Sequence, residues 1–306
     1  MAVTDRIAAH VVQVVMPRLM QPPASLLIAG ADLPAPQPVE IPTEAGAVRA
    51  AVYRPSPAPA APLPPVYVNF HGGGFLIRHP EFDDHICRAL VARTGCVVVN
   101  VDYDVAPQRP FPVAPRQAFG VAAWVARSGP ERGWDGARLA VGGQSAGGNL
   151  AAGLCLAARD RGTFRPVLQI LNHPPLDLAT DPATKTARTA RPLITPRLAR
   201  IFDNAYVPDP ATRTDPLASP LRAPDLAGLP PALVITADHD LLRDEGDRYA
   251  ARLAAAGVPV THHVMPDVDH AYTHVDPPKP LRATLELMTD ALTDVWGAPG
   301  AGPGRG

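Results

Sequence analysis

The sequence predicts an α/β fold in which helices cover both faces of a mostly parallel sheet. Two observations lead to this prediction. Short runs rich in β-branched residues, bounded by turn residues, alternate with helical segments along the chain. Most of these runs are apolar from end to end, which is typical of strands buried on both faces.

The expected elements follow one another in a regular order. The strands are Val48–Tyr53, Val66–Phe70, Cys96–Val101, Leu139–Gly142, Val167–Leu171, Ala232–Thr236 and Val260–Met265. The helices are Ile86–Thr94, Arg116–Arg127, Ala146–Arg159, Asp244–Ala256 and Leu281–Trp296. Near the N-terminus, Ile7, Val11, Val14, Val15 and Met16 fit one face of an amphipathic helix, whereas His10, Gln13 and Pro17 interrupt the apolar run that a signal peptide requires.

Two segments, 1–44 and 177–229, do not fit this alternation. A stretch as long as the second is uncommon as a simple loop inside a compact domain, and it usually serves as a lid or a binding loop. We therefore predict that both segments form a cap over a core of residues 45–176 and 230–296. The Gly- and Pro-rich residues 297–306 are expected to form a disordered tail.

The overall composition excludes several classes of function. The 306 residues carry a formal net charge of −1 and 5% aromatic residues, which fits neither a nucleic-acid surface nor a base-stacking platform. No apolar stretch is long enough to span a membrane. Three widely spaced cysteines, Cys87, Cys96 and Cys155, predict buried free thiols and a cytoplasmic protein.

No metal or cofactor is expected. Asp102 and Asp104 flank the end of a strand, but no further ligands stand near them at a suitable spacing. The glycine-rich segments do not follow the pattern of a phosphate-binding loop.

A serine stands between glycines where an expected strand meets an expected helix. The residues are Gly143-Gln144-Ser145-Ala146-Gly147, the G-x-S-x-G pattern of a nucleophile elbow. Gly143 and Gly147 would let the strand and the helix pass close to the strained serine. The helix dipole would lie beside the Ser145 hydroxyl, so Ser145 is the predicted nucleophile.

A serine hydroxyl needs a base, and the base needs an orienting acid. In this architecture the acid and then the histidine follow the serine along the chain. His270 is the best candidate base because it follows the last strand, whereas His262 and His263 lie within it. For the acid, position at a strand end favours Asp238 or Asp240 and does not separate them. The neighbouring Asp244 and Glu245 are typical of a first helical turn whatever the function.

These motifs together resemble the bacterial hormone-sensitive-lipase-like esterases of the α/β-hydrolase superfamily. Four segments match in order: His71-Gly72-Gly73-Gly74-Phe75, the elbow Gly143–Gly148 with Asn149, Asp240–Gly246, and His270-Ala271-Tyr272. The resemblance covers roughly residues 44–296 and implies an α/β-hydrolase fold with a helical cap. It also implies that Asp240 is the acid.

The resemblance also gives the glycine triplet a role. Backbone N–H groups of Gly73, Gly74 and Ala146 are expected to form an oxyanion hole, while Gly72 serves the turn and His71 orients the loop. The chain departs from the family at three positions. Gln144 stands where aspartate is common, and Asp104 and Gln108 stand where arginine and glutamate are common.

The expected function is a serine carboxylesterase that acts on small-molecule esters through an acyl-enzyme. An acyltransferase, or a hydrolase of methyl esters or amides, would use the same residues and differs in what enters the pocket. A non-catalytic ligand receptor would lack the base, for which this chain has His270. By analogy with relatives, a homodimer through the last strand or helix is a further expectation.

Overall fold

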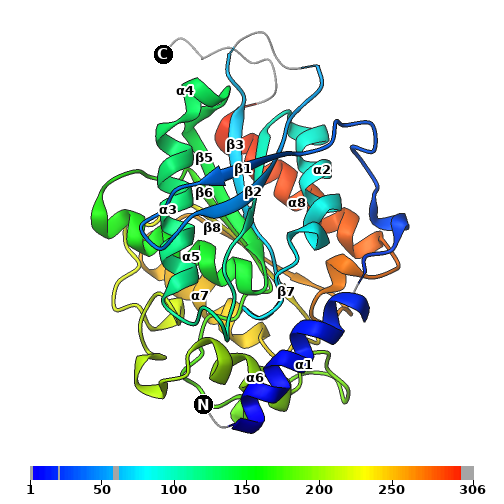
Figure 1. Cartoon of the computed structure of the whole chain (residues 1–306), viewed down its shortest axis with the longest axis vertical. Helices are drawn as coiled ribbons and strands as arrows, with labels where there is room; N and C mark the ends of the chain where they lie inside the picture. The colour runs from blue at the N-terminus through cyan, green and yellow to red at the C-terminus, as the bar shows by residue number, and fades with distance from the viewer. Residues whose placement is uncertain (1–2, 20, 58–61, 298–306) are drawn as a thin grey trace.

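In the computed structural model, the described residues are 3–19, 21–57 and 62–297 (Figure 1). Within them, eight strands form one sheet in the order β1-β2-β4-β3-β5-β6-β7-β8. The strands are β1 (Gln37–Ile41), β2 (Val48–Tyr53), β3 (Pro65–Phe70), β4 (Val97–Asp102), β5 (Asp135–Gln144), β6 (Leu168–Asn172), β7 (Ala232–Ala237) and β8 (Val260–Met265). Strands β3 to β8 are parallel to one another, and β2 runs antiparallel to β1 and β4. The prediction of a mostly parallel sheet is confirmed.

Strand β1 lies inside the range 1–44 that the sequence pattern assigns to a cap, and no strand is predicted there. It pairs with β2 at the edge of the sheet, where Val39 faces Ala50. Pro38 fits this place, because an edge strand tolerates a residue without a backbone N–H. The chain from Gln37 onward therefore belongs to the sheet, which corrects the expectation for this part of the segment.

The predicted helices are confirmed, with ends that differ by a few residues. The helices are α1 (Val3–Leu19), α2 (Asp84–Thr94), α3 (Val113–Arg127), α4 (Gly129–Arg132), α5 (Ala146–Arg161), α6 (Pro196–Tyr206), α7 (Arg243–Ala255) and α8 (Lys279–Trp296). Short 3-10 turns complete the described chain: η1 (Ala24–Leu26), η2 (Pro80–Asp83), η3 (Pro182–Thr184), η4 (Pro210–Thr212), η5 (Pro220–Arg222) and η6 (Tyr272–His274). Residues 298–306, most of the predicted tail, lie outside the described residues.

The helices form a layer on each face of the sheet (Figure 1). Apolar residues of α2 and α8 pack on one face, and those of α3, α5 and α7 pack on the other. Helices α1 and α6 pack against each other beyond one end of the strands. Helix α6 begins where the sequence allows, because the Thr195 hydroxyl accepts a hydrogen bond from the Leu198 N–H at 3.2 Å and Pro196 fills the first helical position.

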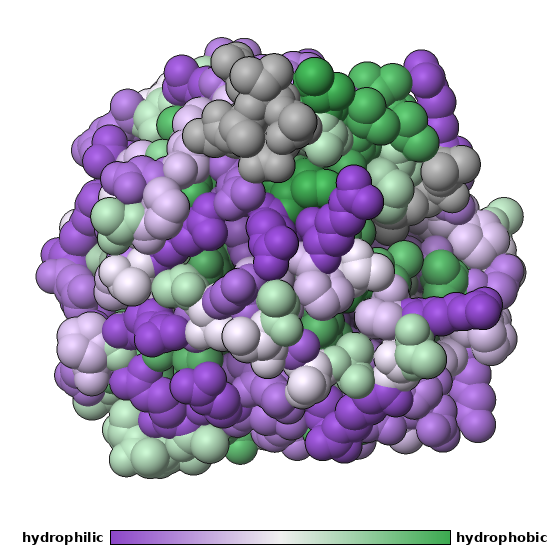
Figure 2. Space-filling model, turned by 90° about the horizontal axis from the view of Figure 1, so that it is seen from below, coloured by the Kyte–Doolittle hydropathy of each residue, from purple (hydrophilic) through white to green (hydrophobic). Residues whose placement is uncertain are grey.

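The apolar stripe of α1 faces outward rather than toward the core. Ile7, Val11 and Val14 are 60%, 53% and 55% exposed. Figure 2 shows apolar residues gathered on part of a mostly polar face. The other side of the helix faces the protein: Ala9 is buried in the core, and the Gln13 amide donates to the carbonyl oxygens of Leu76 and Ala106 at 3.0 and 2.7 Å.

Two expectations from composition can be compared with the structure. Cys87, Cys96 and Cys155 are buried and free, as predicted, and burial raises the pKa of the Cys96 thiol to about 12. Among the described helices, none has both the length and the apolar character needed to cross a membrane.

Candidate active site

The predicted site residues gather at one edge of the sheet. In a parallel sheet the carboxyl ends of the strands share an edge, and ligand sites form in the loops that leave it. Ser145 follows β5, Asp240 follows β7 and His270 follows β8. The loop from His71 to Gly74 follows β3, which lies next to β5.

Ser145 occupies a strained turn between β5 and α5. Its φ is +52° and its ψ −117°, a conformation that few non-glycine residues adopt. The flanking glycines are required for steric reasons. A Cβ atom at Gly143 would lie 2.1 Å from the carbonyl oxygen of Phe70, and one at Gly147 would lie 1.7 Å from the same oxygen. The turn therefore holds the Ser145 hydroxyl at the first turn of α5.

Ser145, His270 and Asp240 form a continuous chain of hydrogen bonds. Oγ of Ser145 lies 2.8 Å from Nε2 of His270, and Nδ1 of His270 lies 2.7 Å from Oδ2 of Asp240. All three residues are buried, Asp240 with 1% of its surface exposed. In such an arrangement His270 can take the proton of the serine while the carboxylate fixes the ring orientation.

The structure separates the two aspartates that the residue pattern leaves open. Asp240 contacts His270 and also accepts a hydrogen bond at 3.0 Å from the backbone N–H of Leu242. The carboxylate of Asp238 instead forms ion pairs with Arg243 and, at 3.4 Å, with Arg188. The geometry thus agrees with the choice that the family resemblance implies.

The glycine triplet after β3 makes a tight loop beside the elbow. Gly73 and Gly74 have φ values of +116° and +59°, which favour glycine. Within the described residues, their N–H groups donate to no other backbone group. Ala146 is the first residue of α5, so its N–H also lacks a partner within the helix. These three groups are available to a bound anion.

His71 is held inside the loop rather than near Ser145. Its Nδ1 lies 2.6 Å from the carbonyl oxygen of Gly72, and its ring stacks on Tyr103 with centroids 4.4 Å apart. The Tyr103 hydroxyl donates to the His71 carbonyl oxygen at 2.9 Å. Burial lowers the pKa of His71, which keeps the ring neutral. These contacts agree with a role in orienting the loop.

A pocket opens above Ser145 between the sheet and the segment 177–229. It encloses about 960 Å³ of space free of protein atoms, its open mouth included. Its lining includes Ser145, His270 and the glycines of the loop after β3. The rest is largely apolar and comes in good part from 177–229: Phe75, Leu178, Leu193, Ile194, Leu198 and Phe202.

His173 is a pocket residue that the sequence pattern does not single out. It follows β6, it is 2% exposed, and its φ is +39°. Neither ring nitrogen has a hydrogen-bond partner. Burial, followed by the charges that His270 and His274 can carry, holds the pKa of His173 well below its usual value. His173 is a neutral ring that packs beside His270.

Glu245 has a wider role than a first-turn helix residue. Its side chain is buried and accepts hydrogen bonds at 2.6 Å from the N–H groups of both Leu176 and Asp177. It also forms a 2.6 Å ion pair with Lys185. Helix α7 is thereby joined to the segment 177–229. Only the burial of this carboxylate, invisible in the sequence, distinguishes it from its neighbour Asp244.

Two departures from the family are accommodated by amide contacts. The Gln144 side chain accepts a hydrogen bond from the Asn172 amide, and the Tyr272 hydroxyl donates to Asn172 at 3.1 Å. Gln108 exchanges hydrogen bonds at 3.0 Å with Gln13 of α1. Neutral amides therefore link the elbow to η6, and the loop after β4 to the N-terminal helix.

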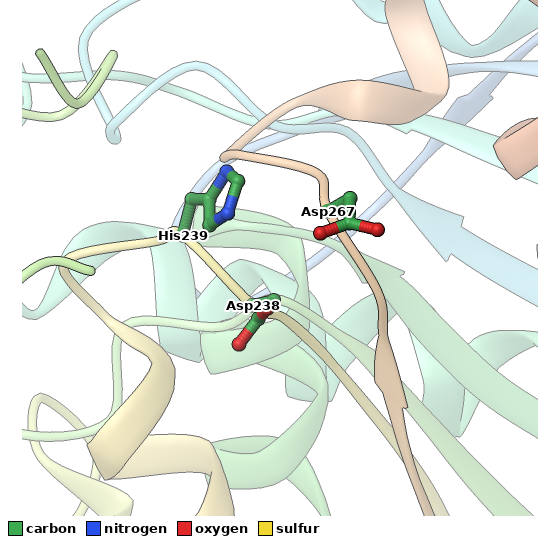
Figure 3. A group of neighbouring side chains, drawn as sticks. All are labelled: Asp238, His239 and Asp267. Atoms are coloured by element: carbon green, nitrogen blue, oxygen red, sulfur yellow. The ribbon is translucent and has the colours of Figure 1, made fainter. Parts of the chain in front are cut away.

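Three side chains of kinds that can bind a metal ion lie together outside the hydrogen-bonded chain of Ser145, His270 and Asp240. Asp238, His239 and Asp267 come from the loops after β7 and β8, and their ligand atoms lie within 4.8 Å of one another (Figure 3). A cation there would compete with Arg243 and Arg188 for the Asp238 carboxylate. We assign no metal to this group, and the absence of a metal requirement stays a prediction.

The fold and the site geometry define an α/β-hydrolase, and comparisons with known proteins agree. A family model described as an alpha/beta hydrolase fold matches residues 67–274. The chain is 36% identical to Esterase LipI of Mycobacterium tuberculosis over 229 residues, which cover 74% of this chain and 72% of that protein. It is 37% identical to Carboxylesterase NlhH of the same organism over 215 residues, 69% of this chain and 67% of that protein.

Solved structures show the same similarity over more of the chain. An esterase of Pyrobaculum calidifontis superposes with a TM-score of 0.82 at 35% identity, over 94% of this chain and 92% of the other. The carboxylesterase EstE1, from a metagenomic library, gives 0.81 at 34% identity, over 96% and 99%. The chain therefore belongs to the hormone-sensitive-lipase-like family of α/β-hydrolases, and it is a hydrolase.

Proposed function

We propose that this chain is a serine carboxylesterase of small-molecule esters. The observation that carries the proposal is the hydrogen-bonded chain of Ser145, His270 and Asp240, with distances of 2.8 and 2.7 Å. The names of its relatives, esterase and carboxylesterase, support the same reaction. The pocket lining supports a substrate that is largely apolar.

In the proposed mechanism Ser145 attacks the ester carbonyl carbon and His270 accepts its proton at Nε2. Asp240 orients the imidazole and stabilises the imidazolium that forms. The N–H groups of Gly73, Gly74 and Ala146 stabilise the negative charge on the carbonyl oxygen. His270 then donates its proton to the leaving alcohol, which leaves an acyl group on Ser145. Water activated by His270 releases the acid.

We propose that the cap, formed by the N-terminal segment and residues 177–229, determines which substrates enter the pocket. Met16 of α1 and several residues of 177–229 contribute to the pocket lining, while the core carries the proposed reacting groups. The cap would therefore select substrates, and the core would perform the reaction.

The experiment is a panel of p-nitrophenyl esters of increasing acyl length, assayed on the wild type and on Ser145→Ala. Release of p-nitrophenol that requires Ser145 is the expected result. Equal turnover by Ser145→Ala would refute the assignment. Product analysis with an added alcohol distinguishes hydrolysis from acyl transfer, since a transferase would form the new ester in preference to the acid.

We also propose that the protein forms a homodimer and that it is located in the cytoplasm. Strand β8 ends the sheet, and Thr261, His262 and His263 within it are exposed, which supports pairing with a second copy. Light scattering on the wild type over a range of protein concentrations tests this dimer, and a monomer at every concentration would exclude it. Buried free thiols support a cytoplasmic location.

A further inference from the structure

The polar side chains that line the pocket differ in how well they are satisfied. The ring nitrogens of His173 and the amide nitrogen of Gln144 have no hydrogen-bond partner among the described residues. Of the two carboxylates that the described residues contribute to the lining, Asp83 is paired with His274 at 2.8 Å. Asp203, in α6, is 4% exposed and lines the pocket, yet its Oδ2 has no hydrogen-bond partner. A buried oxygen without a partner costs about 1–3 kcal/mol, so its retention points to a ligand.

Lys185 supplies a donor in the same part of the pocket. Its ammonium group has three N–H bonds. Nζ donates to the carbonyl oxygen of Asp177 at 2.9 Å and lies 2.6 Å from Oε1 of Glu245. These two contacts use at most two of the three N–H bonds, so at least one remains for a ligand. Burial opposes the charge of Lys185, but the carboxylates of Glu245 and Asp203 outweigh it and raise the pKa of the ammonium.

Lys185 and Asp203 both line the pocket, and the charge of each acts on the ionisation of the other. Burial raises the pKa of Asp203 to about 7, and the charge on Lys185 acts in the opposite direction. The Lys185–Glu245 pair is neutral overall, so the group carries no net positive charge that would attract a carboxylate. A ligand with an ammonium group would be repelled by the charge of Lys185, and it could not accept a hydrogen bond from the remaining Lys185 N–H.

A hydroxyl group satisfies both residues at once, because it accepts one hydrogen bond and donates another. Building on the proposed esterase function, we propose that Lys185 and Asp203 form a subsite for a hydroxyl group that the substrate carries away from its ester bond. The Lys185 N–H donates to the hydroxyl oxygen, and the hydroxyl donates to Oδ2 of Asp203. Apolar side chains such as Phe202, Leu198 and Ile194 line the same pocket and would contact the connecting chain.

The test uses pairs of esters that differ only by a terminal hydroxyl. In one pair the hydroxyl is on the acyl part, p-nitrophenyl hexanoate against p-nitrophenyl ω-hydroxyhexanoate. In the other it is on the alcohol part, hexyl acetate against ω-hydroxyhexyl acetate. Both pairs are repeated at chain lengths of about six to ten carbons, since the fit of a pocket changes with each methylene. The quantity compared is the ratio of kcat/KM for the hydroxylated ester to that for the plain ester.

The wild type is expected to prefer the hydroxylated ester at least about tenfold in one of the two series. Asp203→Leu should bring that ratio to one or below, because a hydroxyl then enters a pocket without its acceptor. Asp203→Asn keeps an acceptor and should keep most of the preference. The matched control is Asp209→Asn, an exposed residue of the same segment outside the pocket, which should leave the ratio unchanged.

The result separates this inference from the function on which it rests. Ester hydrolysis that requires Ser145 but shows a ratio near one in both wild-type series overturns the subsite alone. Absence of hydrolysis with every ester overturns the esterase proposal. In that case calorimetric titration of the wild type with hexanediol and hexanol still tests the subsite, and equal affinities overturn it. The wild-type comparisons need no variant, so they stand if Asp203→Leu does not fold.

Discussion

The imidazole of His173 stands against the imidazole of His270, with ring centroids 4.5 Å apart and planes at 63°. His270 is thus held on two sides, by Asp240 at Nδ1 and by a neutral aromatic edge. The second contact comes from β6, a strand that contributes none of the other proposed catalytic residues.

Replacing His173 should slow turnover without weakening substrate binding. Asparagine tolerates the positive φ at this position but leaves a gap beside His270. A small displacement of the base His270 lowers the rate strongly. We therefore expect kcat of His173→Asn to fall by about tenfold to a hundredfold while KM changes little. Steady-state kinetics on p-nitrophenyl butyrate measures both. His263→Asn, at an exposed position of β8, is the control. An unchanged kcat would show that Asp240 alone positions His270.

The two neighbouring aspartates should differ in their importance for catalysis. Asp240→Asn removes the charge that stabilises protonated His270, so kcat should fall by about 10³-fold or more. Asp238→Asn disturbs only the pairing with Arg243 and Arg188, and kcat should stay within a few-fold. Both variants are assayed side by side at the same pH. The opposite ranking would move the acid to Asp238.

Activity should require glycine at position 74 for a reason other than its positive φ, namely the lack of space for a side chain. Gly74 and Gly162 have nearly equal φ values, +59° and +62°. A Cβ at Gly74 would lie 2.8 Å from the Phe202 ring, whereas a Cβ at Gly162 would have no heavy atom of the described residues within 4 Å apart from its chain neighbours. Alanine at either position should destabilise the fold by about 1–2 kcal/mol. Only Gly74→Ala should also lose about 10²–10³ in kcat, through displacement of its N–H.

Urea denaturation and esterase kinetics on the two variants measure the two effects separately. Equal activity of Gly74→Ala and Gly162→Ala would exclude the Gly74 N–H from the oxyanion hole. The double variant Gly74→Ala/Phe202→Leu shows how much of the loss is caused by contact with the ring.

His85 should make the fold sensitive to acid. Burial lowers its pKa from 6.5 to about 4, and its Nε2 lies 2.9 Å from the Thr273 carbonyl oxygen. The unfolded chain therefore binds this proton near pH 6.5, whereas the folded chain resists it until about pH 4. The contribution is complete above pH 6.5 and is lost as the pH falls through this window, by about 3 kcal/mol in total.

His85→Gln keeps a donor for Thr273 and cannot ionise, so its unfolding free energy should fall less steeply between pH 7 and pH 4.5. Urea unfolding at a series of pH values compares it with the wild type. His263→Gln, at an exposed position, should follow the wild-type curve. Parallel curves for His85→Gln and the wild type would contradict the proposed origin of the sensitivity.

Much of the fold follows from local patterns in the sequence. Apolar runs such as Val97–Val101 predict buried strands, and apolar residues at helical spacing predict the helices between them. Burial of a strand or of one helix face requires apolar residues at regular positions in the sequence. The edge strand β1 was missed because an edge strand needs little apolar content and tolerates Pro38. The sequence predicted the apolar stripe of α1, but it did not show that this stripe faces the solvent.

Ser145 was predicted from the G-x-S-x-G turn and His270 from its place after the last strand, whereas the oxyanion-hole role of the glycine loop was implied by the family resemblance. Ser145 needs Gly143 and Gly147 because the Phe70 carbonyl passes so close, and only glycine meets that demand. The choice of Asp240 over Asp238 needed either the family or the fold, because two residues in one loop differ only in which way their side chains point.

The tertiary structure alone decided which residues surround these groups. His173, Glu245, Lys185 and Asp203 are ordinary polar residues in the sequence, and their environments come from segments far apart in the chain. The lowered pKa of His173, the ion pair of Glu245 with Lys185 and the unpartnered oxygen of Asp203 all depend on burial by segments that meet only in the folded chain. The sequence patterns therefore predicted the candidate site residues, whereas the lining of the pocket was defined only by long-range packing.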